Sequence, residues 1–192
     1  SEHRRVEMGS GSASVLVGIL LAIGVFIAVL PADPWLAANR IVRAMREDLA
    51  RLCLHERVPR RSAFESLAYD RINQLMPLVQ NSGRKGEAVL GGSVAAATVG
   101  LEILRLRGAS QNQAIPPETT VSIANFLRGL ARELLFRSPG DPQTATVAVA
   151  RQYAAGIAQR NATGDMLQIA ASLRIIAAAM EDFPDFFAKD RG

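Results

Sequence analysis

The residue types that most often carry catalysis are few in this chain, and their spacing does not suit them to it. The only histidines are His3 and His55. His55 has Glu56 beside it but no second ligand at the spacing of a metal site, so we expect a surface residue in a turn. The adjacent carboxylates Glu47–Asp48 and Glu181–Asp182 would point in different directions on a helix. They therefore do not predict an acid–base pair.

Motifs for nucleophiles and phosphates are also missing from the sequence. No serine lies in a Gly-x-Ser-x-Gly turn, and Gly91–Gly92 falls inside a helical pattern instead of a phosphate-binding loop. The single cysteine, Cys53, excludes an internal disulfide framework and a cysteine-rich metal site. Its leucine neighbours indicate a small core residue instead of a reactive thiol. We predict no enzymatic activity, no catalytic, cofactor-binding or metal-ligating residue, and no cofactor.

Composition points to helices and argues against a nucleic-acid partner. The chain has 192 residues, of which 49% are hydrophobic and only 5% aromatic. Abundant Ala, Leu, Arg and Glu favour helix over strand. The net charge is +4, and arginines mixed with acidic residues are typical of solvated helix surfaces. A nucleic-acid site would rest on Arg40, Arg43 and Arg46, which lie too close to an apolar segment to favour it.

That apolar segment is the strongest feature of the sequence. No charged residue occurs between Glu7 and Asp33, and Val15–Leu30 is almost wholly apolar. A spanning helix needs roughly 20 such residues. The basic start His3-Arg4-Arg5 would also suit a secretory signal, but the run is long for one, and Leu30-Pro-Ala is a poor cleavage site. We predict an N-terminal transmembrane helix.

The charges on either side of this helix predict its orientation. Two arginines precede it, Arg4 and Arg5. The arginines that follow it are Arg40, Arg43, Arg46, Arg51, Arg57, Arg60 and Arg61. The positive-inside rule then places the C-terminal part in the cytoplasm. We expect residues 1–33 to form an N-terminal segment with the transmembrane helix and residues 34–192 to form a cytoplasmic helical domain.

The first helix of that domain should begin at Asp33–Pro34, because Asp caps helices and Pro fits the first turn. Apolar residues recur at helical spacing from Trp35 to Leu54. The opposite face carries Arg40, Arg43, Glu47 and Arg51. These arginines could touch anionic lipid head groups, each contributing about 1 kcal/mol, although a solvated face of a packed helix is the favoured interpretation.

A capping box and the positions of glycines predict the next two helices. Ser62–Glu65 has the form of a capping box, so a helix should start near Ala63, with Leu67 facing inward and Pro77 kinking or ending it. After a loop over residues 81–86, a helix should run over 88–106 and close at Gly108. Its uncharged part is about 14 residues, too short to span a bilayer comfortably, which favours a buried central helix. Gly92, Ala96 and Gly100 on one face would admit a neighbouring backbone closely.

Three more helices should complete the domain. They are expected over residues 118–137, with Val121 and Leu130 inward, then up to about residue 160, and from about residue 165 until Pro184 breaks the last one before Phe186–Phe187. No convincing run alternates with a period of two, so no sheet is expected. The predicted fold is all-α: one N-terminal transmembrane helix followed by an antiparallel bundle of about five or six helices.

Several of these segments together resemble one protein family. Leu30-Pro-Ala-Asp-Pro34 with the following run Arg40–Leu52 resembles the end of a membrane half in the fusaric acid resistance (FUSC) family, which includes aromatic carboxylic acid exporters. Phe64–Arg71, Gly100–Arg107 and Phe183–Phe187 look similar to its cytoplasmic helices, in the same order.

The resemblance implies an inner-membrane efflux protein of Gram-negative bacteria that exports small aromatic acids or drugs, often with a periplasmic adaptor protein. Such proteins have many membrane helices, whereas Val15–Leu30 is one. The chain therefore looks like the C-terminal portion of such a transporter, with membrane lipid and the other transmembrane helices of the transporter or its subunits as partners. Because one helix cannot enclose a transport path, no transport residue is named.

Two other functions remain open on the sequence. The chain could be a stand-alone single-pass membrane protein whose cytoplasmic helical domain binds a protein partner. It could also be an enzyme with a membrane anchor, which the motif search disfavours.

Overall fold

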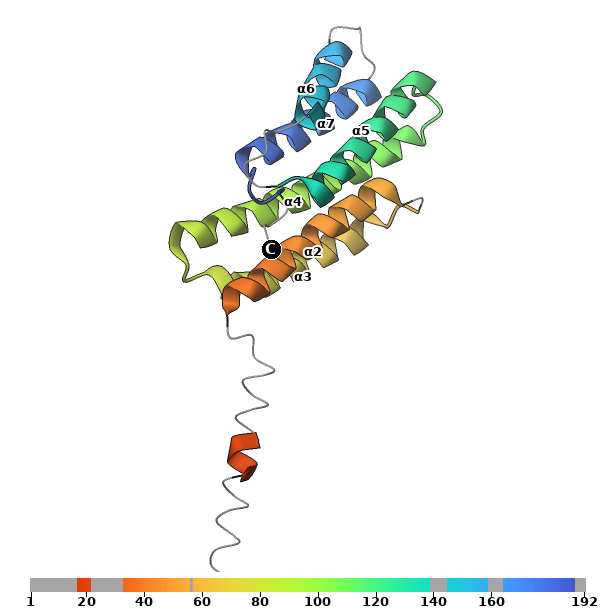
Figure 1. Ribbon diagram of the computed structural model, residues 1–192. Coiled ribbons are helices and arrows are strands. Elements are labelled where there is room, and N and C mark those ends of the chain that lie inside the picture. The colour runs from red at the N-terminus through yellow and green to blue at the C-terminus, as the bar shows by residue number, and fades with distance from the viewer. Residues whose placement is uncertain (1–16, 22–32, 56, 139–144, 159–163, 189–192) are drawn as a thin grey trace, which may run out of the picture. The chain divides into compact units, whose positions relative to one another are not determined.

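The computed structural model describes residues 17–21, 33–55, 57–138, 145–158 and 164–188, and all regular structure in these ranges is helical. The helices are α2 (Pro34–Leu54), α3 (Arg61–Val79), α4 (Gly83–Ser110), α5 (Pro117–Phe136), α6 (Ala145–Ala158) and α7 (Gly164–Asp182) (Figure 1). An all-helical chain is therefore confirmed for the described residues, and α2 to α7 agree with the expected five or six helices.

The chain divides into two compact units, residues 1–37 and 38–192. Most of the predicted transmembrane helix over 15–30 lies outside the described residues; residues 17–21 of it are helical and exposed. Among the described helices, only α4 is long and apolar enough to cross a membrane, and half of its most apolar window is buried inside the protein.

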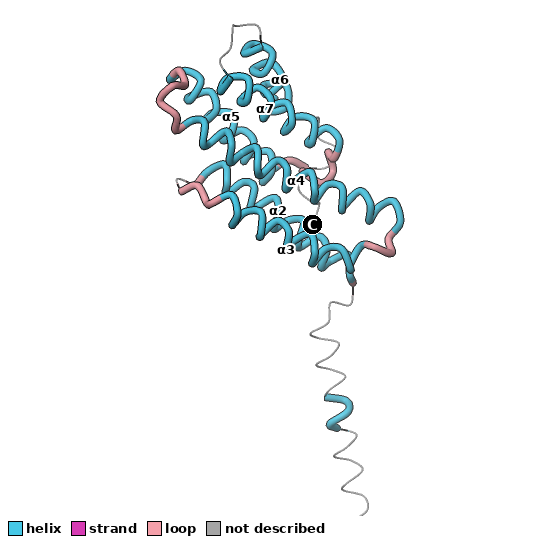
Figure 2. The backbone as a smooth tube through the Cα atoms, turned by 180° about the vertical axis from the view of Figure 1, so that it is seen from behind, coloured by secondary structure: helices cyan, strands magenta, loops and turns pink. Residues whose placement is uncertain are grey.

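Six helices of the second unit form three hairpins, α2–α3, α4–α5 and α6–α7, which lie one above another in Figures 1 and 2. Helix α4 packs against α3, α5 and α7, so it is the central helix. The sequence predicted such a buried central helix correctly. Each of these helices contributes almost completely buried side chains to the core, among them Leu49, Leu75, Ile103, Leu130, Ala154 and Leu173.

Two glycines of α4 receive aromatic side chains instead of a neighbouring backbone. A Cβ on Gly100 would collide with the ring of Phe64 from α3, and one on Gly92 would collide with the ring of Phe186, which follows α7. The expectation of a close backbone approach was therefore wrong. Because glycine has no side chain, it leaves a gap, or notch, on the helix surface. At Gly92 and Gly100 this notch is filled by an aromatic ring from another element.

Several predicted boundaries also need correction. Helix α3 begins at Arg61, and Arg60 at its N-cap makes no side-chain cap bond. The Ser62–Glu65 capping box is therefore not formed; Glu65 instead accepts a bond from Arg61 Nε at 2.7 Å. Such i,i+4 pairs stabilise a helix surface. Helix α3 continues past Pro77 and ends two residues later, at Val79.

The connection from α3 to α4 is shorter than predicted, because α4 already starts at Gly83 inside the expected loop. Gly83 has φ +56°, a conformation that glycine adopts without strain. A Cβ on Gly86 would collide with the carbonyl of Val79, so this tight turn requires glycine there as well. At its other end α4 runs through Gly108 to Ser110. Gly108 is not among the positive-φ residues and does not cap the helix.

The structure confirms the predicted start of α2 but not every residue that was expected to face inward. Asp33 caps α2 as expected, since its Oδ1 accepts the N–H of Trp35 at 2.8 Å. The last helix ends before Phe186–Phe187 as expected, although α7 stops at Asp182, two residues ahead of Pro184; both rings are buried. Leu67 and Val121, in contrast, are exposed, and the prediction that they face inward was wrong.

Candidate functional site

Residues 183–188, which follow α7 and are called the closing segment below, are held by two buried arginines from distant parts of the chain. Arg137 Nη2 at the end of α5 donates to the carbonyl of Pro184 at 3.1 Å. Arg46 Nη1 on α2 lies 3.5 Å from the carbonyl of Phe186. Both arginines are less than a tenth exposed. The guanidinium groups thus satisfy backbone carbonyls that have left the helix.

Arg137 also forms a buried ion pair. Its Nη1 lies 3.2 Å from Glu133 Oε1, and the two side chains are 5% and 3% exposed. An ion pair buried this deeply is expensive to break, because the remaining charge loses both water and its partner. The pair therefore fixes the end of α5 beside the closing segment.

A second buried polar cluster joins α4 to α7. Ser172 Oγ donates to Glu102 Oε2 at 2.7 Å, and Arg105 Nη1 lies 2.6 Å from Glu102 Oε1. Glu102 is 4% exposed. Both carboxylate oxygens are occupied by protein donors, so this cluster is a cross-link between helices and not an open binding site.

The sequence analysis missed these buried charges because it treated the charged residues as solvated. For Arg46 a signal was present. It lies four residues after Val42 and three before Leu49, both buried, so helical spacing places it on the apolar face of α2. Glu133 and Arg137 are paired at i,i+4 and Glu102 and Arg105 at i,i+3, so local spacing suggests the pairs themselves. It does not reveal their burial, nor the distant partners Ser172 and the Pro184 carbonyl.

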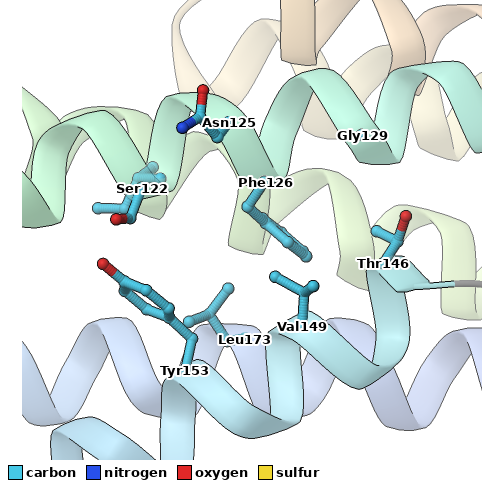
Figure 3. A pocket seen from close by; sticks show the side chains of 9 residues that line it. Ser122, Asn125, Phe126, Gly129, Thr146, Val149, Tyr153 and Leu173 are labelled. Atoms are coloured by element: carbon cyan, nitrogen blue, oxygen red, sulfur yellow. The ribbon is translucent and has the colours of Figure 1, made fainter.

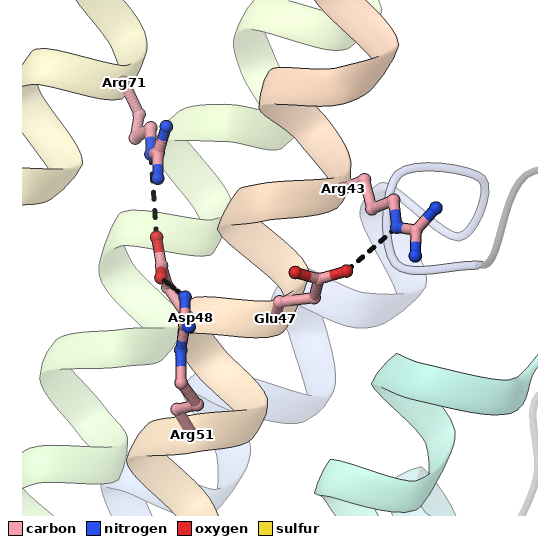
Figure 4. A network of polar contacts seen from close by, with 5 residues as sticks. All are labelled: Arg43, Glu47, Asp48, Arg51 and Arg71. Carbon is pink, nitrogen blue, oxygen red and sulfur yellow. Dashed lines mark hydrogen bonds and ion pairs between the residues drawn. The ribbon is translucent and has the colours of Figure 1, made fainter.

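The outer face of α2 is different, since Arg43, Glu47 and Arg51 are exposed and paired, and only Asp48 is largely covered (Figure 4). Arg43 Nε lies 2.8 Å from Glu47 Oε1. Asp48 pairs with Arg51 on the same helix, and Asp48 Oδ2 lies 3.6 Å from Arg71 Nε on α3. This pattern agrees with the solvated helix face favoured by the sequence. Glu47 and Asp48 also turn to different partners, as predicted.

Cys53 is buried in the core at 7% exposure, as its leucine neighbours predicted. Burial raises the pKa of its thiol from 9.0 to about 12, although the charge of nearby Arg107 acts in the opposite direction. The thiol is therefore protonated at neutral pH and a poor nucleophile. His55 lies exposed just after α2, in the surface position expected for it.

An open groove lies between α5 and α6, with its floor on α7 (Figure 3). Its volume is about 330 Å³. It is lined by Ser122, Ile123, Asn125, Phe126, Gly129, Thr146, Val149, Tyr153 and Leu173. No motif in the sequence pointed to this groove, because its lining residues come from three helices and none has a distinctive spacing.

No group of three or more His, Cys, Asp or Glu side chains in the described part of the chain could hold a metal ion. Glu133 and Arg137 bond to each other, and Glu102 bonds to Ser172 and Arg105; among the described residues, Glu133 Oε2 and Arg137 Nε are buried without a hydrogen-bond partner. The described residues provide a helical domain with a mainly apolar groove between α5 and α6, which is suited to binding.

Comparison with known proteins gives one result. The model of the fusaric acid resistance protein family matches residues 6–187, nearly the whole chain. This match confirms the resemblance seen in the sequence segments. Comparison with curated proteins and with solved structures gave no match.

Proposed function

We propose that this chain, which belongs to the fusaric acid resistance protein family, is the C-terminal part of an inner-membrane efflux transporter of that type. The family is one of membrane transporters, and export of small aromatic acids or drugs is the activity proposed for the whole transporter. The observation that carries the proposal is the extent of the family match. It includes both the apolar segment near the N-terminus and the helical domain.

In this proposal the segment over residues 15–30 crosses the membrane and α4 does not. The segment has no charged residue, whereas α4 carries the buried Glu102 and is surrounded by α3, α5 and α7. A helix with three protein neighbours and a carboxylate bonded to α7 is suited to the centre of a water-soluble domain. The domain itself is proposed to lie in the cytoplasm, in accordance with the arginines that follow the segment.

The proposed role of this part is assembly, since a single membrane helix cannot surround a transport path. Its partners would be membrane lipid and the other transmembrane helices of the transporter or its subunits, with a periplasmic adaptor protein on the far side of the membrane. No nucleic acid is proposed as a partner.

A second candidate function is supported by the second unit itself. Residues 38–192 form a compact unit with their own core, closed by the segment that Arg46 and Arg137 hold. Such a unit could act as the partner-binding domain of a stand-alone single-pass membrane protein.

The size of the native protein separates the two functions. An antibody against the helical domain would be used to probe membranes of the source organism by immunoblot. A band several times larger than the 20.6 kDa of this chain is expected for part of a polytopic transporter. A membrane band near 20.6 kDa would contradict that proposal and favour the single-pass protein. A signal confined to the soluble fraction would contradict both.

A further inference from the structure

We propose that the groove between α5 and α6 binds a neutral aromatic molecule of about two rings. The inference goes beyond the transport function, because the groove belongs to the helical domain and needs no membrane path. Its volume of about 330 Å³ falls in the range of small-molecule sites, which is roughly 300–1,000 Å³. Both long walls are rigid helices, α5 and α6, and Leu173 of α7 forms part of the floor (Figure 3).

The lining favours an aromatic ligand. Phe126 from α5 and Tyr153 from α6 extend their rings into the space between the helices, and Val149 lies opposite Phe126 (Figure 3). Aromatic rings pack well edge-to-face or offset against other rings, at centroid distances of about 4.5–7 Å. Val149 is exposed and Tyr153 half-buried, so a flat molecule would bury apolar surface against these two side chains, beside the largely buried Phe126 ring.

The missing side chain at Gly129 leaves the groove open, although the surrounding protein atoms would leave room for a Cβ there. Within 4 Å, a Cβ on Gly129 would meet only Thr146 Oγ1, at 3.6 Å, an ordinary contact. Gly92 and Gly100 of α4 are different, because the rings of Phe186 and Phe64 already fill the space beside them. The space beside Gly129 is left for another molecule, and a larger residue there would fill it.

The polar groups of the groove favour a neutral molecule. None of the lining residues is charged. Ser122 Oγ already donates to the carbonyl of Glu118, and Asn125 Oδ1 accepts from Arg128. Within the described residues this leaves the hydroxyls of Tyr153 and Thr146 and the side-chain NH2 of Asn125, all of them neutral groups, to bond a ligand. A carboxylate in this groove would lose water without gaining a cation, which is strongly unfavourable.

The test uses a thiol placed in the groove of the full chain in detergent. Thr146→Cys introduces it, and Gly108→Cys, at a position with no side-chain neighbour within 4 Å, is the matched control. Labelling by methyl methanethiosulfonate would be timed without ligand, with neutral 2-naphthol and with anionic 2-naphthoate at equal concentration and pH 7. Cys53 is buried, so its resistance to labelling reports that each variant is folded.

At saturating 2-naphthol, we expect labelling of the Thr146→Cys chain to slow at least about tenfold, while the Gly108→Cys chain is unaffected. 2-Naphthoate should have little effect on either. Adding Gly129→Leu should abolish the protection, and Val149→Phe serves as a second filling variant if that chain does not fold. Equal labelling with and without 2-naphthol would overturn the proposal. Stronger protection by 2-naphthoate, or protection that survives filling of the groove, would overturn it as well.

Discussion

At the scale of single residues, burial determines what Cys53 can do. A thiol with a pKa of about 12 instead of 9.0 has a thiolate fraction about 1,000-fold lower at pH 8, and thiolate is the reactive form. We expect iodoacetamide at pH 8 to leave the folded chain unmodified for hours and to add one group after denaturation, as mass spectrometry would show. Rapid modification of the folded chain would contradict the buried position.

The same shift affects stability at high pH. Below pH 9.0 the thiol is protonated in both states, so it makes no difference there. Above 9.0 the unfolded chain loses the proton while the folded chain keeps it until about pH 12. The contribution of Cys53 to the free energy of unfolding should therefore fall as pH rises from 9.0 to about 12, and Cys53→Ala should flatten this fall in urea unfolding.

A second residue-scale prediction concerns the buried ion pair. Arg137→Met leaves Glu133, 5% exposed, without its cation and also removes the bond to the Pro184 carbonyl. Breaking a buried pair from one side costs about 3–5 kcal/mol. Urea unfolding of the detergent-solubilised chain, followed by far-UV circular dichroism, would measure this loss.

The controls for this prediction replace other partners. Arg43→Met breaks the exposed pair with Glu47 and should cost less than about 1 kcal/mol. The double variant Glu133→Gln with Arg137→Met should recover part of the loss, since no unpaired charge stays buried. An Arg137→Met chain as stable as the Arg43→Met chain would contradict the structural role of the buried pair.

At the scale of helices, Gly100 and Gly108 of α4 are expected to respond in opposite ways to replacement by alanine. Gly100→Ala should destabilise the protein by about 1–3 kcal/mol through overpacking against the Phe64 ring. Gly108→Ala, in the same helix with nothing within 4 Å, should stabilise it by about 0.5–1 kcal/mol, because alanine is the better helix former. Thermal unfolding of both variants would show whether the signs differ. Equal effects would mean that the notch at Gly100 is not filled.

This contrast also shows what could be predicted from the sequence. Helices follow from the local recurrence of apolar residues, so α2 and α5 were placed within one or two residues of their observed ends. The side chain that packs beside a helical glycine can come from a distant part of the chain. Phe64 reaches Gly100 across 36 positions, and nothing in the spacing around Gly100 identifies the ring that fills it.

The failed capping box illustrates the same limit at a helix end. Ser62 and Glu65 have the right spacing, but Arg61 precedes them and takes the Glu65 carboxylate as an i,i+4 partner. Competition between two local patterns determined the start of α3. The groove between α5 and α6 is harder still to predict from the sequence, because it depends on how three helices are arranged and on the small residue at Gly129.

At the scale of the whole molecule, the orientation in the membrane is open to direct measurement. The arginines after residue 33 predict that a reporter fused after Gly192 is in the cytoplasm. A green fluorescent protein fusion should therefore be bright, and an alkaline phosphatase fusion should be inactive. The reverse result would contradict the proposed orientation. Replacing the exposed Arg40 and Arg43 by Gln should weaken the preference for the cytoplasm, and Arg46 is kept because it holds the closing segment.

The way in which the closing segment is held has a consequence for folding kinetics. Each helical hairpin brings together residues close in the chain, whereas the bond from Arg46 to Phe186 spans 140 positions. Contacts that close such a long loop are slow to form, so residues 183–188 should dock after the rate-limiting step. Phe186→Leu should then accelerate unfolding and leave the refolding rate almost unchanged, which stopped-flow measurements in urea would resolve. The lifetime of the folded domain would thus be set by a segment that contributes little to how fast it forms.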